Sequence, residues 1–204
     1  MKRLVLILPL VLMSLAAPAL AESFPHYADV SGVAADDVLN IRAEPLASAP
    51  IIGVIPPDTT LIEVTGASED GKWRRLNAGE RSGWVSARYL KSEPMPPWWT
   101  ERVPLFCYGT EPFWSVSYEP GLLSLEMPGE EPRSLGIEWS GAPRSGAFET
   151  IGWKIRGGGA EGFSVLRNRE CSDGMSDRKY AIGIDFFLRT PEEDLVFTGC
   201  CALN

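Results

Sequence analysis

Histidine is almost missing from this sequence of 204 residues, since the one copy, His26, stands near the start of the chain. Cysteine and serine nucleophiles both rely on a nearby general base, usually a histidine, and the Gly-x-Ser-x-Gly motif of serine hydrolases is absent. No two cysteines have the Cys-x-x-Cys spacing of zinc ligands. The sequence therefore predicts a protein that is not an enzyme and that holds no metal and no cofactor.

Long hydrophobic runs are also missing beyond the first twenty-one residues. Lys2 and Arg3 precede an apolar stretch over 4–15, and Ala19-Leu20-Ala21 follows, which is the layout of a cleaved secretory signal. The stretch is shorter than the roughly 20 apolar residues that a bilayer span requires. We expect cleavage after Ala21, no membrane span in the mature protein, and a periplasmic or secreted location.

Basic residues are outnumbered. The chain has 19 Lys and Arg against 27 Asp and Glu, and loss of Lys2 and Arg3 leaves 17, so the formal charge becomes −10. Phosphate backbones and anionic lipid surfaces attract basic proteins. The charge therefore argues against nucleic acid and against an anionic membrane surface as the main partner.

Cysteine is absent from the first half of the chain. Cys107, Cys171, Cys200 and Cys201 all lie in the second half, and an even number in an exported chain favours disulfides. Because the neighbours Cys200 and Cys201 cannot easily bond to each other, we expect Cys107 and Cys171 each to pair with one of them. Which of the two neighbours each one takes stays open.

A sustained helical period is absent as well, and short β-branched runs take its place. Three prolines within 94–97 forbid both helix and sheet interior and separate two β-rich blocks. The predicted fold class is all-β, a small SH3-like barrel followed by a six-to-eight-stranded antiparallel barrel or sandwich stapled by disulfides. The predicted organisation is a signal peptide at 1–21, a first domain at 27–93, a Pro/Trp linker at 94–104 and a second domain at 105–204.

The predicted strands differ in how well the sequence defines them. Alternation is clearest in Trp114, Val116 and Tyr118, which would point to one face. Residues 128–161 are rich in Gly and Pro and give no firm register. The predicted strands are 38–42, 51–55, 60–64, 72–76 and 82–86 in the first block, and 113–118, 122–126, 162–166, 180–188 and 195–198 in the second.

The first block resembles a bacterial SH3 domain. The match is carried by Leu39-Asn40-Ile41-Arg42-Ala43-Glu44-Pro45, by Ile52-Gly53-Val54-Ile55-Pro56 and by Gly83-Trp84-Val85-Ser86-Ala87-Arg88-Tyr89-Leu90. The resemblance implies a five-stranded barrel without catalytic residues and an adaptor role, commonly towards peptidoglycan or peptide segments.

Four residues of the first block are candidates for ligand binding. Trp73 or Trp84 could form, with Tyr89, the aromatic floor of a groove, and Arg42 could face a carboxylate of the ligand. Packing is the competing interpretation of the two tryptophans, because Trp84 and Val85 point to opposite faces and one of them must line the core. A mixed polar surface explains Arg42 equally well.

The second block resembles a family of bacterial envelope modules that carries no assigned activity. The motifs are Gly109-Thr110-Glu111-Pro112-Phe113-Trp114, the run from Cys171 to Tyr180, and Gly199-Cys200-Cys201. Paired carboxylates can divide acid and base work in glycoside cleavage, but Asp173-Gly174 is also ordinary turn chemistry. The candidate ligand contacts of this block are Glu111, Trp114, Ser172, Asp173, Ser176 and Asp177.

Together these observations favour a non-catalytic binding or adaptor protein of the cell envelope, with peptidoglycan or an envelope protein as its partner. An inhibitor of a lytic enzyme such as lysozyme is the alternative, because an acidic surface would favour docking to a basic target. A carboxylate-dependent hydrolase that uses Glu111 and Asp173 is the weaker alternative.

Overall fold

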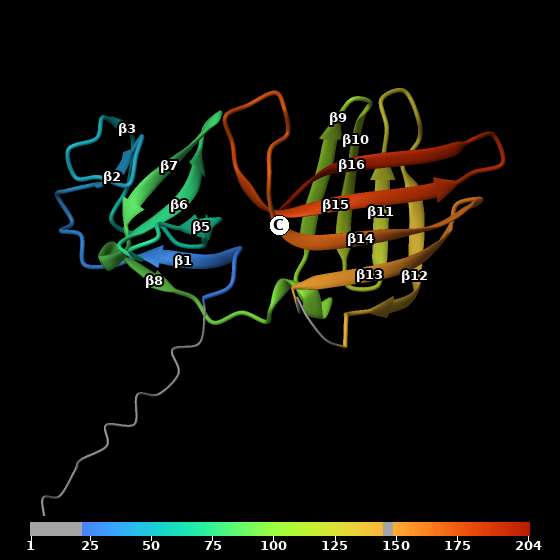
Figure 1. Ribbon diagram of the computed structural model, residues 1–204, viewed down its shortest axis with the longest axis horizontal. Helices are drawn as coiled ribbons and strands as arrows, with labels where there is room; N and C mark the ends of the chain where they lie inside the picture. The colour runs from blue at the N-terminus through green and yellow to red at the C-terminus, as the bar shows by residue number, and fades with distance from the viewer. Residues whose placement is uncertain (1–21, 145–148) are drawn as a thin grey trace, which may run out of the picture.

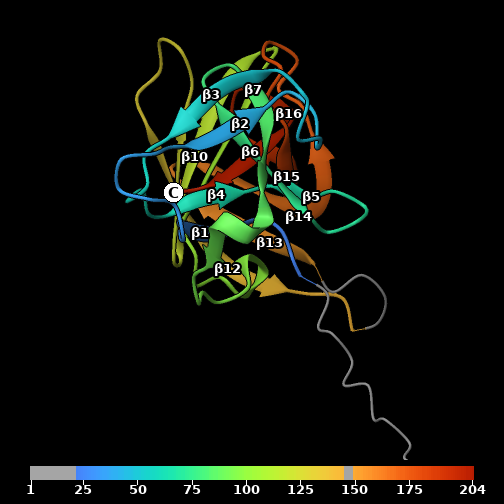
Figure 2. The ribbon, with the colours of Figure 1, turned by 90° about the vertical axis from the view of Figure 1, so that its left-hand side faces the viewer.

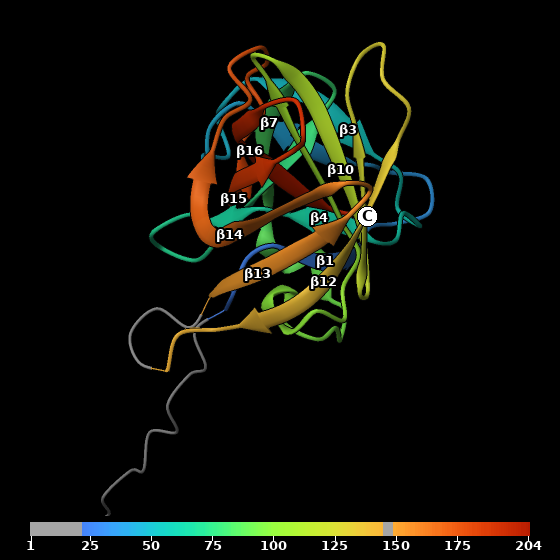
Figure 3. The same cartoon turned by 90° about the vertical axis from the view of Figure 1, so that its right-hand side faces the viewer.

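The computed structural model describes residues 22–144 and 149–204, which form two β-modules side by side (Figure 1). The N-terminal module comprises strands β1 to β8, and the C-terminal barrel comprises strands β9 to β16. Figure 2 views the molecule from the side of the N-terminal module, and Figure 3 views it from the side of the barrel. The predicted all-β fold class is confirmed, whereas the predicted signal segment lies outside the described residues.

Two small antiparallel sheets build the N-terminal module. One sheet has the order β4-β1-β8 and the other has the order β3-β2-β7-β6-β5. Thr65 alone separates β4 from β5, so this run of chain leaves the first sheet and enters the second. The strands are β1 (His26–Val30), β2 (Leu39–Arg42), β3 (Ile51–Ile55), β4 (Ile62–Val64), β5 (Gly66–Ala67), β6 (Trp73–Ala78), β7 (Arg81–Ser86) and β8 (Leu90–Ser92).

The alternation of side chains decides what fills the N-terminal module. Val85 is fully buried while its neighbour Trp84 is only partly buried, so Val85 is the one that lines the core. A short 3-10 helix, η1 (Ala87–Tyr89), then turns the chain from β7 into β8. The buried cluster of this module consists of Leu39, Ile41, Ile55, Leu76 and Val85.

The C-terminal half closes into a barrel of eight antiparallel strands, in the order β10-β11-β12-β13-β14-β15-β16-β9. Pairing of β9 with both β10 and β16 closes the ring, and full closure leaves no strand edge unpaired. The strands are β9 (Leu105–Thr110), β10 (Phe113–Glu119), β11 (Leu122–Glu126), β12 (Arg133–Gly141), β13 (Thr150–Gly157), β14 (Ala160–Cys171), β15 (Tyr180–Arg189) and β16 (Asp194–Leu203).

Large side chains fill the interior of this barrel. Trp114, Val116 and Tyr118 are all buried on one face of β10, as their spacing predicts, and Tyr118 stacks on Trp153 at 4.7 Å between ring centroids. Trp98 from the short helix η2 (Trp98–Thr100) is buried in the same cluster. The barrel is therefore a packed core.

Two disulfides staple the barrel, Cys107–Cys201 and Cys171–Cys200, which confirms that Cys107 and Cys171 each pair with one of the neighbours. The strand register explains the choice, because Cys107 lies opposite Cys201 in the pairing of β9 with β16. Successive residues of a strand face opposite ways, so Cys200 faces away from that pair and meets Cys171 instead.

The loop between β14 and β15, residues 172–179, leaves the barrel and lies against the β6–β7 hairpin of the N-terminal module (Figure 1). Asp177 donates its backbone N–H to the Glu80 carbonyl at 2.8 Å and accepts the Ser82 N–H at 3.1 Å. The Lys179 N–H reaches the Asn77 side-chain oxygen at 3.1 Å. A β-bridge between Arg81 and Asp177 thus ties the two modules together.

Both helices of the described residues are short. None in this part of the chain has the length and hydropathy needed to cross a membrane.

Candidate ligand groove of the N-terminal module

A groove of about 900 Å³ runs along the N-terminal module. Four parts of the chain meet there: the segment before β2 together with β2 itself, Ala47 of the loop that follows, the turn that leads into β6, and helix η1 with the residue before it. We call this feature the groove; its lining consists of residues 32–34, 37–40, 42, 47, 71–73 and 86–89.

Two aromatic side chains line the groove, Trp73 at the start of β6 and Tyr89 in η1. Both are partly buried, so each presents part of its ring to the groove. The Arg88 guanidinium lies 4.5 Å from the centroid of the Tyr89 ring and donates a hydrogen bond to the Tyr89 hydroxyl at 2.7 Å. The groove therefore combines flat aromatic surface with an adjacent fixed cation.

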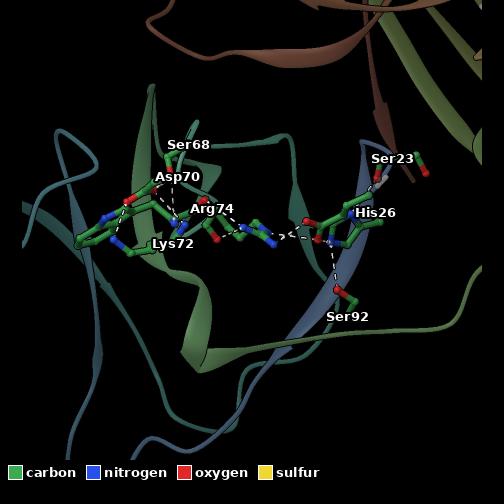
Figure 4. A network of polar contacts seen from close by, with 10 residues as sticks. Ser23, His26, Ser68, Asp70, Lys72, Arg74 and Ser92 are labelled. Atoms are coloured by element: carbon green, nitrogen blue, oxygen red, sulfur yellow. Dashed lines mark hydrogen bonds and ion pairs between the residues drawn. The ribbon is translucent and has the colours of Figure 1, made fainter. Parts of the chain in front are cut away.

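A network of polar contacts holds the turn that leads into Trp73 (Figure 4). Asp70 accepts hydrogen bonds from the Ser68 hydroxyl at 2.7 Å and from the Lys72 N–H at 3.1 Å. The Ser68 hydroxyl in turn accepts the Trp73 N–H at 3.1 Å. The hydrogen bond from Ser68, followed by those from Lys72, lowers the pKa of Asp70 to about 2. The turn is thus fixed before any ligand arrives.

The charges along the groove are mixed but mainly positive. Lys72, Arg88 and Arg42 line it together with a single acidic residue, Asp37, and the Lys72 ammonium pairs at 3.2 Å with Asp70, which lies outside the lining. Arg42 donates to the Ala49 carbonyl at 2.7 Å and so also ties down the loop between β2 and β3. This excess of positive charge suits a ligand with a carboxylate, although the chain as a whole is acidic.

The sole histidine has a structural position (Figure 4). His26 is buried in β1, where its Nδ1 lies 3.0 Å from the Ser23 carbonyl and its Nε2 lies 3.3 Å from the Glu22 carboxylate. Glu22 also pairs with Arg74 on β6. His26 therefore anchors the first described residues to the N-terminal module.

The comparison of families decides what this module is. Residues 37–91 match the family model of the bacterial SH3 domain. The N-terminal module is a bacterial SH3 domain. The match spans β2 to the middle of β8 and includes most of the groove lining. Domains of this kind are typically binding modules. A comparison with curated proteins finds no match to the chain.

Three of the four candidates in the SH3 domain meet in the groove, namely Arg42, Trp73 and Tyr89. The fourth, Trp84, lies on β7 with the Arg75 guanidinium 5.9 Å from its ring centroid. It is partly covered by this cation and stands apart from the groove lining.

The candidates of the second block are divided among three places. Trp114 is buried in the barrel core, 5.3 Å from Phe197 between ring centroids. Glu111, Ser172 and Asp173 line a small crevice of about 380 Å³ beside the turn between β9 and β10. Asp177 lies at the junction with the SH3 domain, where its backbone hydrogen-bonds with Glu80 and Ser82.

Asp173 organises its own loop. Its carboxylate accepts the Met175 N–H at 3.0 Å and both the N–H and the hydroxyl of Ser176, at 2.8 and 2.7 Å. Burial alone would raise its pKa, but these hydrogen bonds outweigh burial and hold the pKa below its usual range. The carboxylate is thereby occupied as a hydrogen-bond acceptor.

Sequence reasoning missed Lys72 and the segment 32–34 in the groove. The Ser68 to Lys72 stretch carries a turn signal, because Ser and Asp side chains bond to nearby backbone groups. That signal predicts the turn. It does not tell which side chains the turn brings next to η1, since their approach depends on contacts between distant parts of the chain.

Proposed function

We propose that the protein is an exported, non-catalytic binding protein of the bacterial cell envelope, and that the groove of its SH3 domain takes a carboxylate-bearing peptide stem of peptidoglycan. Disulfides form and persist in oxidising compartments, so the two disulfides support an extracytoplasmic location. Cleavage of a signal after Ala21 would bring the protein there. Recognition of an envelope protein through the same groove is the competing form of this proposal.

The observation that carries the proposal is the chemistry of the groove. Trp73 and Tyr89 offer flat apolar surface that packs against a ligand at little cost in conformational entropy. Lys72 and Arg88 stand beside them and can donate charge-assisted hydrogen bonds to a carboxylate. A peptide that ends in a carboxylate satisfies both features.

The non-catalytic part of the proposal is supported by the positions of the polar candidates. Asp173 is bound by its own loop, and His26 is buried in a structural network. We therefore assign the protein to recognition.

Cosedimentation with purified peptidoglycan sacculi tests the proposal. The purified protein should sediment with sacculi, and Tyr89→Ala and Trp73→Ala should each weaken binding about tenfold or more, because removal of a central aromatic contact has effects of this size. Trp139→Ala is the matched control, since Trp139 is a 61% exposed aromatic on β12 of the barrel. It should bind like the parent.

Two results would overturn the peptidoglycan form. One is sedimentation of the parent no greater than that of an unrelated protein of equal charge. The other is full retention of both groove variants while their circular dichroism melts remain native. If the parent does not bind sacculi, chemical crosslinking in cells identifies the partner instead. A crosslink to an envelope protein that disappears in Tyr89→Ala would favour that protein as the partner.

An inhibitor of a lytic enzyme is the second candidate function, favoured by the formal charge of −10 that remains without Lys2 and Arg3. The rate of lysozyme on a soluble oligosaccharide substrate, with and without the protein, decides this candidate. An unchanged rate at excess protein would remove it.

A further inference from the structure

A second pocket lies between the SH3 domain and the barrel, separate from the groove. Its volume is about 480 Å³, and both modules line it. The docked loop 172–179 and the β6–β7 hairpin hold its walls in place through the bridge between Arg81 and Asp177. We call it the interdomain pocket; the residues that matter here are Glu63, Phe106, Tyr108, Asp173, Arg178 and Tyr180.

Glu63, on β4 of the SH3 domain, supplies a carboxylate to this pocket. One of its oxygens accepts the Leu203 N–H of the barrel at 3.0 Å. Burial raises the pKa of Glu63 to about 7, and this backbone hydrogen bond is the one contact that lowers it. Among the described residues, the ion pairs made by Lys, Arg and His go to other acids, and Arg178 pairs with Glu80. Glu63 is thus a partly buried carboxyl that forms no ion pair within the part of the chain that the structure describes.

Arg178, on the docked loop, supplies a positive charge to the same pocket. Its Nε donates to the Gly79 carbonyl at 2.6 Å, and an Nη2 atom lies 3.1 Å from Glu80. Hydrogen bonding with Tyr180, followed by other contacts, raises its pKa. The guanidinium is thus fixed in place and stays charged.

Two phenol groups complete the polar lining. The Tyr108 hydroxyl donates to the Tyr180 hydroxyl, and the two rings meet edge to face at 5.6 Å between centroids. The Tyr180 hydroxyl accepts this bond and keeps its own proton free to donate. Phe106, 37% exposed, adds an apolar surface to the lining.

We propose that the interdomain pocket binds the head group of an α-amino acid, with its ammonium group on Glu63 and its carboxylate on Arg178 and the Tyr180 hydroxyl. The third charged residue of the lining, Asp173, already accepts three hydrogen bonds from its own loop, so Glu63 and Arg178 are left to meet a ligand. A ligand with a single charge would be attracted by one of these two residues and repelled by the other. A zwitterion satisfies both, and it gives the partly buried Glu63 carboxyl a cationic partner. Phe106 then contacts the aliphatic part of the ligand. This inference does not rest on the groove.

Isothermal titration calorimetry of the purified protein near neutral pH tests the inference. The probes are L-alanine, D-alanine and L-leucine, with alanine methyl ester and N-acetylalanine as analogues that keep one charge each. At least one amino acid should bind at millimolar concentration or below, and both single-charge analogues should bind about tenfold more weakly or not at all. Nε-acetyl-lysine carries the same head group on a longer uncharged side chain, so its affinity measures how long a side chain the pocket accepts.

The variant Glu63→Gln probes the ammonium contact. Glutamine keeps an oxygen that can accept the Leu203 N–H, so the fold should survive, while affinity for the amino acid should fall about tenfold or more. An ammonium bound to Glu63 favours its ionised form, so binding should release protons, seen as heats that depend on the buffer. Glu63→Gln should abolish this release. Glu126→Gln, an exposed acid on β11, is the matched control and should behave like the parent.

Absence of binding by all three amino acids would overturn the inference, and so would equal affinity in Glu63→Gln. Tight binding of N-acetylalanine by the parent would also contradict it, because the pocket would then recognise the carboxylate alone. Sacculus binding by the parent and by the groove variants tests the proposed function, and neither outcome of that experiment changes the result of this titration.

Discussion

The carboxyl of Glu63 also makes the stability of the protein depend on pH. Arg178, Tyr108, Tyr180 and Asp173 face the same pocket, and Tyr27 pairs with Glu63 across β1 and β4. Burial raises the pKa of Glu63 from 4.5 to about 7. Because the folded state has the higher pKa, the stabilisation is fully present below about pH 4.5 and is lost as the pH rises through about 7.

We therefore predict that Glu63→Gln flattens this dependence. In the parent, the contribution of Glu63 to the free energy of unfolding should fall by on the order of 3 kcal/mol between pH 4.5 and 7.5 or above, since each pKa unit corresponds to about 1.4 kcal/mol. Urea denaturation of the parent and the variant at both ends of this range measures the difference. An equal decline in both proteins would show that other groups cause it.

At the scale of elements, the period of two along β16 decides the disulfide framework. Cys201 faces Cys107 across the pairing of β9 with β16, while Cys200 faces the other way and holds Cys171 at the start of the docked loop. The second disulfide therefore ties the loop that carries the contacts with the SH3 domain.

Replacement of both cysteines of the second disulfide, Cys171→Ser with Cys200→Ser, should cost roughly 3–4 kcal/mol, because the crosslink spans 29 residues of chain. Guanidinium denaturation under oxidising conditions measures the loss. The matched comparison is Cys107→Ser with Cys201→Ser, which opens a crosslink over 94 residues and should cost more, roughly 5 kcal/mol. The reverse order of the two losses would contradict the argument.

The strands that could be predicted from the sequence are those with short apolar runs. Residues 51–55 and 122–126 coincide with β3 and β11. By contrast, β12 and β13 were missed, because their sequences are rich in Gly and polar residues and a bulge between Ile137 and Trp139 breaks the alternation. Their strand character comes from neighbours on both sides in the closed barrel, which a local pattern does not show.

The candidate site was predictable to a similar degree. The alternation of side chains along a strand predicts that one of Trp84 and Val85 lies in the core, and in the structure that residue is Val85. Whether the outward residue faces a groove depends on loops from elsewhere in the chain, and for this reason Trp73 lines the groove while Trp84 lies beside Arg75. The docking of residues 172–179 on the SH3 domain had no local signal at all.

At the scale of the whole molecule, the SH3 domain and the barrel are joined by side chains as well as by the linker. The Asn77 amide accepts the Lys179 N–H and donates to the Lys179 carbonyl at 3.2 Å, and the Ser82 hydroxyl also accepts the Lys179 N–H at 2.8 Å. Partly buried polar contacts of this kind help to fix orientation, because a group that loses its partner is left unsatisfied. The two modules should therefore behave as one cooperative unit.

The double variant Asn77→Ala with Ser82→Ala should weaken this junction without touching either core. We expect one calorimetric unfolding transition in the parent and two in the variant, as the modules lose their coupling. Trypsin cleavage after Arg178 and Lys179 should also become faster in the variant, because the docked loop then opens more often. Ser124→Ala on β11 is the control and should match the parent in both measurements. Two results would contradict this prediction: two unfolding transitions already in the parent, or a loop in the double variant that resists trypsin as well as it does in the parent. Either result would mean that Asn77 and Ser82 do not couple the two modules.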